Sequence, residues 1–314
     1  MDTVGQVAGL PGAELLIGAV DCHVHACPHL NSRSLDVFQA VEEAAAAGLR
    51  AIGLMDNFAN SSGLAALANR RLGRLGVEVF GGLIMEPPAG GICVDAVRIA
   101  LGYGYGPGDG ARFVSLPTHH TRYMARAERR SPAWVESCLE IPEAAPLPDP
   151  LREILDLIAA ADVVFNTGHV SGPEAVRAVE AARAAGVSRI LAPCSHFEPE
   201  AVAEITGLGA IAEFSFFFAS HATQVGLTHV DAEKNVSAAV SAPLMAERIR
   251  AAGVGSSILS SDCGVFLLPP PAEGLREFLL LMREADFSEA DLRRMSSETP
   301  ACLFGVGGDA PDPD

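Results

Sequence analysis

The chain has 314 residues, with 22 Lys and Arg against 39 Asp and Glu, so its formal net charge is −17. A surface this acidic argues against nucleic acid or an anionic membrane as the main partner. No segment approaches the roughly 18 to 20 uncharged apolar residues that a membrane-spanning helix needs. We therefore expect the partner to be a small-molecule substrate, with a homo-oligomer as the one further assembly left open.

The seven cysteines are scattered along the chain and form no CxxC pair. Each is expected to be a small core residue with a reduced thiol. The N-terminal residues also lack the basic leader of a secretory signal. These two features together predict a cytoplasmic location.

Apolar, strand-like runs alternate with amphipathic, alanine-rich runs along most of the chain. In chain order we expect strand 16–26, helix 35–47, strand 51–57, helix 63–72, strand 77–85, helix 94–101, strand 111–118, helix 150–160, strand 162–171, helix 173–185, strand 189–196, helix 199–206, strand 210–218, helix 238–252, strand 256–264 and helices 273–284 and 288–295. Eight nearly all-apolar strands separated by helices predict a parallel (β/α)8 TIM barrel as a single domain over residues 1–314. The alternative is a doubly wound open sheet, but no GxGxxG or P-loop follows the first strand.

Two connections are longer than ordinary loops, and both follow the C-terminal end of a strand. Residues 121–149, after the fourth strand, carry several arginines and Trp134, and we expect them to form a lid or insertion. Residues 219–237, after the seventh strand, hold His221, His229 and Lys234. The Gly, Asp and Pro-rich residues 306–314 are expected to be a disordered tail.

Metal-capable side chains stand at the ends of four predicted strands. The first strand ends Asp21-Cys22-His23-Val24-His25, and residues two apart in a strand share a face, so His23 and His25 point the same way. Three later strands each end in one further candidate, namely His169, His196 and Asp262. Because the C-terminal ends of parallel barrel strands form one face, these side chains are expected to meet at the barrel mouth.

These motifs resemble the amidohydrolase superfamily. The similar segments are DCHVH on the first strand, TGHVS on the fifth, PCSHF on the sixth and SSDCG on the eighth. The segment from Thr299 to Gly305 is also similar to the Asn-Pro-Ala-x-x-Leu-Gly ending of that superfamily, with Thr299 and Phe304 as departures. The resemblance runs in order over nearly the whole chain but identifies no subfamily.

The resemblance implies a divalent metal held by His23, His25 and His169, with Asp262 completing or flanking the ligand set. Imidazole and carboxylate ligands suit Zn²⁺ best, while Mn²⁺, Fe²⁺ and Co²⁺ also fit. Asp262 would act as general base toward a water of lowered pKa and later return the proton to the leaving group. His196 would polarise the substrate carbonyl or bind a second metal.

One departure from the superfamily limits the number of metal ions. Its binuclear members often bridge two metals with a carboxylated lysine at the end of the fourth strand. Lys234 is the only lysine of this chain, and it lies beyond the seventh strand. One ion is therefore favoured over two, with Glu86 as an alternative bridging or single-metal ligand.

Further side chains are candidates for supporting roles. Glu213 interrupts an apolar strand and would either hydrogen-bond a ligand histidine or face outward at a helix junction. Residues expected to contact substrate lie at or beyond the strand ends: Arg33, Asn57, His119, His120 and Arg122. Of these, the two arginines suit an anionic substrate group, because guanidinium binds carboxylate bidentately.

The function predicted from these features is that of a metal-dependent hydrolase. Its substrate would be a small amide, lactam or cyclic imide cleaved at a C–N bond, or a lactone ester. A zinc-dependent decarboxylase or lyase of the same superfamily is the main alternative. A non-catalytic metal- or ligand-binding barrel is the alternative from another class, and an enzyme with a nucleophilic cysteine is a weaker third.

Overall fold

The computed structural model describes residues 9–142, 147–225, 227–228, 234–235 and 238–307. Eight parallel strands form one sheet in the order β1-β2-β3-β4-β5-β6-β7-β10. Their bounds are β1 (Val20–Val24), β2 (Ala51–Leu54), β3 (Glu78–Ile84), β4 (Phe113–Ser115), β5 (Val164–Asn166), β6 (Ile190–Pro193), β7 (Ile211–Ser215) and β10 (Ser257–Ser260). Each lies within the range predicted for it, and all eight are shorter than predicted.

The sheet curves until its first and last strands meet. Val24 forms a parallel bridge with Cys263, just beyond the end of β10. The His25 amide donates to the Cys263 carbonyl at 2.8 Å, and the Asp262 amide donates to the His23 carbonyl at 2.9 Å. The predicted (β/α)8 barrel is therefore confirmed, and the open doubly wound sheet is excluded.

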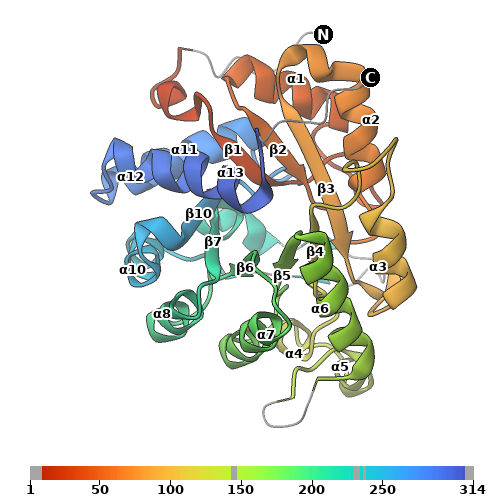
Figure 1. The fold of residues 1–314 in the computed structure, drawn as a ribbon. Helices are drawn as coiled ribbons and strands as arrows, with labels where there is room; N and C mark the ends of the chain where they lie inside the picture. The colour runs from red at the N-terminus through yellow and green to blue at the C-terminus, as the bar shows by residue number, and fades with distance from the viewer. Residues whose placement is uncertain (1–8, 143–146, 226, 229–233, 236–237, 308–314) are drawn as a thin grey trace.

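Eight helices of eight to fourteen residues cover the outside of the barrel (Figure 1). They are α1 (Val37–Ala47), α2 (Ser62–Leu72), α3 (Val94–Leu101), α6 (Asp149–Ala161), α7 (Gly172–Ala184), α8 (Pro199–Gly207), α10 (Ala242–Ala252) and α11 (Pro271–Glu284). Local sequence sets several of their ends. Asp36 and Gln39 form a capping box on α1, and Gly48 ends that helix with a φ of 82°, a conformation that favours glycine.

Both predicted long connections are present. The one after β4 contains α4 (Arg122–Ala127) and α5 (Pro132–Ser137). The one after β7 begins with α9 (Phe216–Ala219) and the 3₁₀ turn η4 (His221–Val225), followed by the short pair β8 (Leu227–Thr228) and β9 (Lys234–Asn235). His229 and most of the predicted tail, residues 308–314, lie outside the described residues.

The end of the chain closes the N-terminal end of the barrel. After α11, the helix α12 (Glu289–Arg293) continues through the π-helical turn η6 (Arg294–Glu298) into α13 (Thr299–Phe304). Phe304 stacks on Phe80 of β3 with ring centroids 4.6 Å apart. Both belong to an inner apolar cluster that includes Phe113 and Ile258, whereas a larger cluster fills the space between strands and helices.

Four short 3₁₀ turns complete the description: η1 (Ala13–Leu16), η2 (Gly73–Leu75), η3 (Pro87–Ala89) and η5 (Val254–Ser256). None of the described helices is both long and apolar enough to span a bilayer. Apolar side chains fill the barrel interior at the N-terminal end of the strands, and the predicted site residues lie at the C-terminal end.

Candidate metal centre

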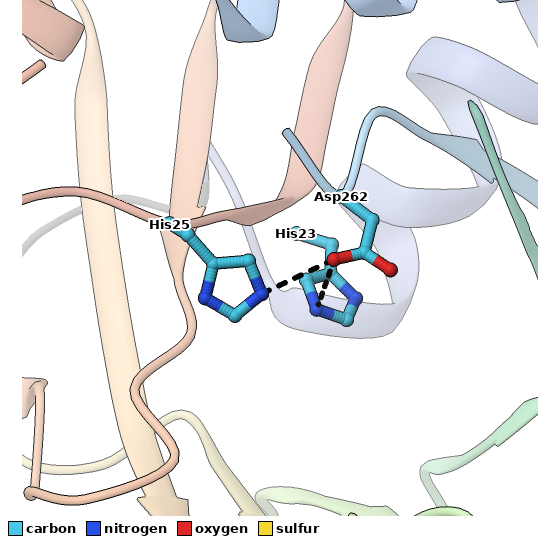
Figure 2. Close-up of side chains that lie close together, drawn as sticks. All are labelled: His23, His25 and Asp262. Atoms are coloured by element: carbon cyan, nitrogen blue, oxygen red, sulfur yellow. Dashed lines mark hydrogen bonds and ion pairs between the residues drawn. The ribbon is translucent and has the colours of Figure 1, made fainter. Parts of the chain in front are cut away.

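Three buried side chains converge at the C-terminal end of the barrel (Figure 2). Asp262 Oδ1 lies 3.2 Å from His23 Nε2 and 3.1 Å from His25 Nε2. One ligand atom from each residue lies within 4.8 Å of the other two. Two imidazole nitrogens and one carboxylate oxygen that face a common point make a donor set typical of a divalent metal site.

The backbone at the barrel closure brings these residues together. The hydrogen bond from the Asp262 amide to the His23 carbonyl joins positions on opposite ends of the chain. Asp262 adopts a left-handed φ of 51°, which aspartate tolerates better than most residues. Its second oxygen, Oδ2, accepts a hydrogen bond of 3.3 Å from Ser215 Oγ, which helps to hold the carboxylate in place.

Glu213 supports the outer side of His23. His23 Nδ1–H donates to Glu213 Oε1 at 2.9 Å, and Ser260 Oγ donates to the same oxygen at 2.7 Å. This contact directs Nε2 of His23 toward Asp262, because the proton is held on Nδ1. Of the two orientations left open by the sequence, the structure therefore has Glu213 facing inward against the histidine.

The electrostatics of the site favour a cation. Burial alone would lower the pKa of His23, but the nearby carboxylates of Asp262 and Glu213 outweigh it and raise that pKa to about 9. Burial lowers the pKa of His25 to about 4, so His25 is neutral at pH 7 and available as a ligand. For Asp262, burial alone would raise the pKa, but His23 and His25 outweigh it and hold the pKa below its ordinary value.

The cluster opens into a cavity of about 310 Å³, referred to below as the first cavity. Four other predicted site residues line it: Arg33, Asn57, His119 and His169. Asn57 Nδ2 donates to Thr118 Oγ1 at 2.8 Å. His169, predicted as a metal ligand, faces the cavity but does not belong to the three-residue cluster. Burial lowers its pKa to about 3, so it is neutral at pH 7.

His196 does not reach the cluster. It lines a second cavity of about 280 Å³, where its Nε2–H donates to the Ala238 carbonyl at 2.9 Å and its ring packs on Phe218 with centroids 4.5 Å apart. From the sequence, His196 was expected to polarise the substrate carbonyl or to bind a second metal beside the cluster. The difference arises because His196 lies in a turn three residues beyond β6, where the alternation of a strand no longer sets side-chain direction.

Two predicted substrate contacts are directed elsewhere, and neither lines the first cavity. The guanidinium of Arg122 donates to Glu140 at 2.6 Å and to Glu136 at 3.1 Å, so these carboxylates on the same long connection already pair with it. His120 packs on Trp134, with ring centroids 5.3 Å apart, and its Nε2 lies 3.1 Å from the Ser137 carbonyl.

Both carboxylate oxygens of Glu86 accept hydrogen bonds from the loop after β4. It accepts hydrogen bonds from the backbone amides of Thr118, His119 and His120 at 2.6, 2.6 and 3.2 Å, and from Thr118 Oγ1 at 3.1 Å. It does not line the first cavity. Because both oxygens hold the loop after β4, the structure does not support the predicted alternative in which Glu86 bridges or binds a metal.

Three residues that border both cavities were not predicted from the sequence, namely Met124, Glu128 and Phe218. Met124 lies in α4 and Glu128 directly follows that helix, so both belong to the connection predicted as a lid. Phe218 lies on α9, after β7. A buried carboxylate such as that of Glu128, whose side chain is 6% exposed, is uncommon, but nothing in the sequence distinguishes it from the exposed acidic residues nearby.

The residues present fit a divalent cation on chemical grounds. The buried cluster combines neutral His25, a carboxylate held ionised on Asp262, and His23 oriented by Glu213. A bound cation would replace the proton that the carboxylates otherwise hold on His23. The first cavity leaves room beside the cluster for water and substrate.

Comparison with known proteins agrees with this architecture. The model of a family of unknown function (DUF6282) matches residues 18–213. Three solved structures share the fold: the probable dipeptidase PvdM from Pseudomonas aeruginosa (12% identity, 94% of this chain and 97% of that chain covered, TM-score 0.58), an amidohydrolase from the same organism (10%, 94% and 98%, 0.57) and a mutant of a PTE-like lactonase from Deinococcus radiodurans (16%, 94% and 97%, 0.56). No curated protein matches the chain in sequence.

Proposed function

The chain belongs to the family of unknown function DUF6282, and we propose that it is a metal-dependent hydrolase of the amidohydrolase type. Its substrate is a small molecule with a C–N bond in an amide, lactam or cyclic imide, or with a lactone ester. The observation that carries this proposal is the convergence of His23 Nε2, His25 Nε2 and Asp262 Oδ1 in a buried position that opens into a cavity.

His23, His25 and Asp262 hold the cation, with His169 as the proposed further ligand from the same cavity. When bound, a divalent cation polarises a carbonyl and lowers the pKa of a water molecule. Asp262 accepts the proton of the attacking water and delivers it to the leaving group. Glu213 keeps His23 in the tautomer that presents Nε2, and Asn57 and His119 contact the substrate beside the cluster.

We propose Zn²⁺ as the cation, since imidazole and carboxylate donors suit it, and one ion rather than two. His196 points into the second cavity and Glu86 is occupied by backbone amides, so neither supplies an obvious second set of ligands. The structural neighbours named above, a probable dipeptidase, an amidohydrolase and a PTE-like lactonase, are compatible with hydrolysis. A cytoplasmic location and a lid role for residues 121–149 belong to the same proposal.

A zinc-dependent decarboxylase is a second candidate, because Arg33 in the first cavity suits a carboxylated substrate. Such a lyase would use a histidine from the sixth strand as acid and base. His196 occupies that place in the sequence but faces the second cavity, which favours hydrolysis. Incorporation of ¹⁸O from labelled water into the product separates the two reactions, because hydrolysis adds an oxygen atom of water to the acyl carbon of the product and decarboxylation does not.

The test begins with the metal content of the purified protein and with the variant His23→Ala/His25→Ala. We expect about one equivalent of zinc in the wild type, loss of that metal in the variant, and hydrolysis of a panel of amides and lactones that a chelator abolishes. A wild type without bound metal, or hydrolysis that survives the double substitution, contradicts the proposal. Metal binding without any turnover would support the non-catalytic barrel instead.

A further inference from the structure

The first and second cavities adjoin each other and share part of their lining. Both are bordered by His169 together with Met124, Glu128 and Phe218. The metal cluster and Arg33 line only the first cavity, whereas His196 and Phe197 line only the second. A ligand bound at the cluster and extending past these shared side chains would enter the second cavity.

The second cavity is suited to an apolar group. Its walls include Val170, Phe197 and Phe218, and two of its polar groups already have partners within the protein. His196 Nε2–H donates to the Ala238 carbonyl, and Ser195 Oγ accepts from the Ser215 amide at 3.1 Å. A ligand group that needs no hydrogen bonds is favoured here, because it buries apolar surface without displacing these contacts.

Arg33 provides the opposite chemistry in the first cavity. Its Nη2 lies 3.0 Å from His29 Nε2, and burial together with the Arg33 charge lowers the pKa of His29 to about 3, so that histidine carries no charge. Arg33 Nε is buried and has no hydrogen-bond partner among the described residues. Asp56 and Asp262 act on Arg33 at longer range, and no described carboxylate forms an ion pair with it.

We infer that the substrate is an N-acylated amino acid, with its carboxylate on Arg33 and an apolar acyl group in the second cavity. This inference rests on the proposed hydrolase function and specifies its substrate. A carboxylate supplies the charge and the acceptor atoms that the Arg33 guanidinium lacks. The amide bond between the two ends is then placed beside His23, His25 and Asp262, which line the first cavity together with Arg33.

The reaction is a hydrolysis without any redox step. A water oxygen bonds to the acyl carbon and the C–N bond breaks. That oxygen stays in the new carboxylate, and the protons of water pass by way of Asp262 to the amine. The products are an apolar carboxylate and a free amino acid.

Three probes separate the contributions of the two ends: N-hexanoylglycine, its neutral analogue N-hexanoylglycinamide and the short N-acetylglycine. Binding is measured by calorimetry on chelator-treated protein, so that no metal contributes to carboxylate binding. We expect the wild type to prefer N-hexanoylglycine to its amide by about 10- to 100-fold, as for a charge-assisted contact. Arg33→Met should abolish this preference, Arg33→Lys should retain part of it, and the exposed Arg98→Met should leave it unchanged.

The acyl end is tested by Ala127→Phe, which adds a ring to the second cavity from the exposed side of α4. This variant should lose the preference for hexanoyl over acetyl and keep the preference for the charged probe. Melting temperatures establish that the variants are folded, and Arg33→Gln replaces Arg33→Met if the latter is unfolded.

Equal binding of the charged and neutral probes, or a charge preference that survives in Arg33→Met, overturns the inference. Zinc-dependent hydrolysis of N-hexanoylglycine and N-hexanoylglycinamide at equal rates, unchanged in Arg33→Met, would also overturn it, while leaving the hydrolase proposal intact. Conversely, selective binding of N-hexanoylglycine without turnover by the zinc-loaded protein would support the binding site and contradict the hydrolase proposal.

Discussion

The two histidines of the cluster differ in what holds their outer nitrogens. His23 Nδ1–H donates to Glu213, whereas His25 Nδ1 is buried and has no hydrogen-bond partner among the described residues. A ligand histidine with a carboxylate on its far nitrogen is more basic and better oriented than one without it. His23 is therefore the histidine whose contribution to metal affinity depends on a second residue.

Replacing Glu213 tests this dependence. We expect Glu213→Ala to weaken zinc affinity by about 10- to 100-fold, because His23 loses the partner that orients it. Glu213→Gln should have a smaller effect, since its amide oxygen can still accept from Nδ1–H. Competition with a chromophoric chelator measures the affinity. Glu43→Gln, a change at a buried carboxylate on α1, is the matched control, and equal zinc affinity in Glu213→Ala and wild type would contradict the role.

The position of a site residue could be predicted where its backbone still pairs with a neighbouring strand, as at His23 and Asp262, and not where it lies in a turn or a long connection. His23 is within β1 and Asp262 is two residues past β10, so the shared edge of parallel strands places them together. His196 lies in a turn, and Arg122 pairs with acidic residues whose position depends on the fold of a long connection. Their directions are set by tertiary contacts that periodicity does not encode.

Among the elements, the packing of α1 against α11 contains an unusual buried acid. Glu43 of α1 is 3% exposed, and its Oε2 has no hydrogen-bond partner within the described parts of the chain. Burial raises the pKa of Glu43 to about 7, against a hydrogen bond from the Ala272 backbone, and the charges of Asp21 and Glu273 add to the rise. The folded protein therefore holds a proton on Glu43 more tightly than the unfolded chain does.

A pH-dependent loss of stability follows. Below about pH 4.5 Glu43 is protonated in both the folded and the unfolded protein, so it does not lower the free energy of unfolding. As the pH rises toward 7, Glu43 ionises in the unfolded chain but stays protonated in the folded protein, and the folded state is destabilised. The rise in pKa from 4.5 to about 7 corresponds to roughly 3 kcal/mol of unfolding free energy by pH 8. Glu43→Gln should remove most of this loss, as measured by urea unfolding at pH 5 and pH 8. The exposed Glu42→Gln on the same helix should not, and parallel pH profiles for Glu43→Gln and wild type would refute the assignment.

The order and type of the elements were largely predictable, whereas the ends of some were not. All eight barrel strands and the helices that cover them alternate as the apolar pattern indicates. The helix predicted at 238–252 begins instead at Ala242 with Pro243 in its first turn, because proline is tolerated there but not in a helix interior. Continuation of the final helical segment through a π-helical turn into α13 depends on packing against the barrel end, which local sequence does not show.

Over the whole molecule, the inner apolar cluster and the candidate metal centre lie at opposite ends of the barrel. The N-terminal end is filled by the inner apolar cluster, which α13 completes with Phe304. The C-terminal end carries the metal cluster and both cavities, lined by residues from the connections after the strands. The family match ends at residue 213, before Asp262, so the aspartate of the cluster belongs to a part of the chain outside that match.

This separation predicts that a change at the closed end affects folding without affecting the site. Phe304→Ala removes a ring that is 3% exposed and stacked on Phe80, and should lower the free energy of unfolding by about 3 to 5 kcal/mol, as for other buried aromatic truncations. Urea unfolding measures this loss, with Leu281→Ala, at a position 36% exposed on α11, as the control expected to cost far less. Zinc affinity of the folded Phe304→Ala protein should equal that of the wild type, because Phe304 does not line the first cavity. If the folded Phe304→Ala protein binds zinc more weakly than the wild type, the two ends of the barrel are coupled. The predicted independence of folding stability and metal binding would then be wrong.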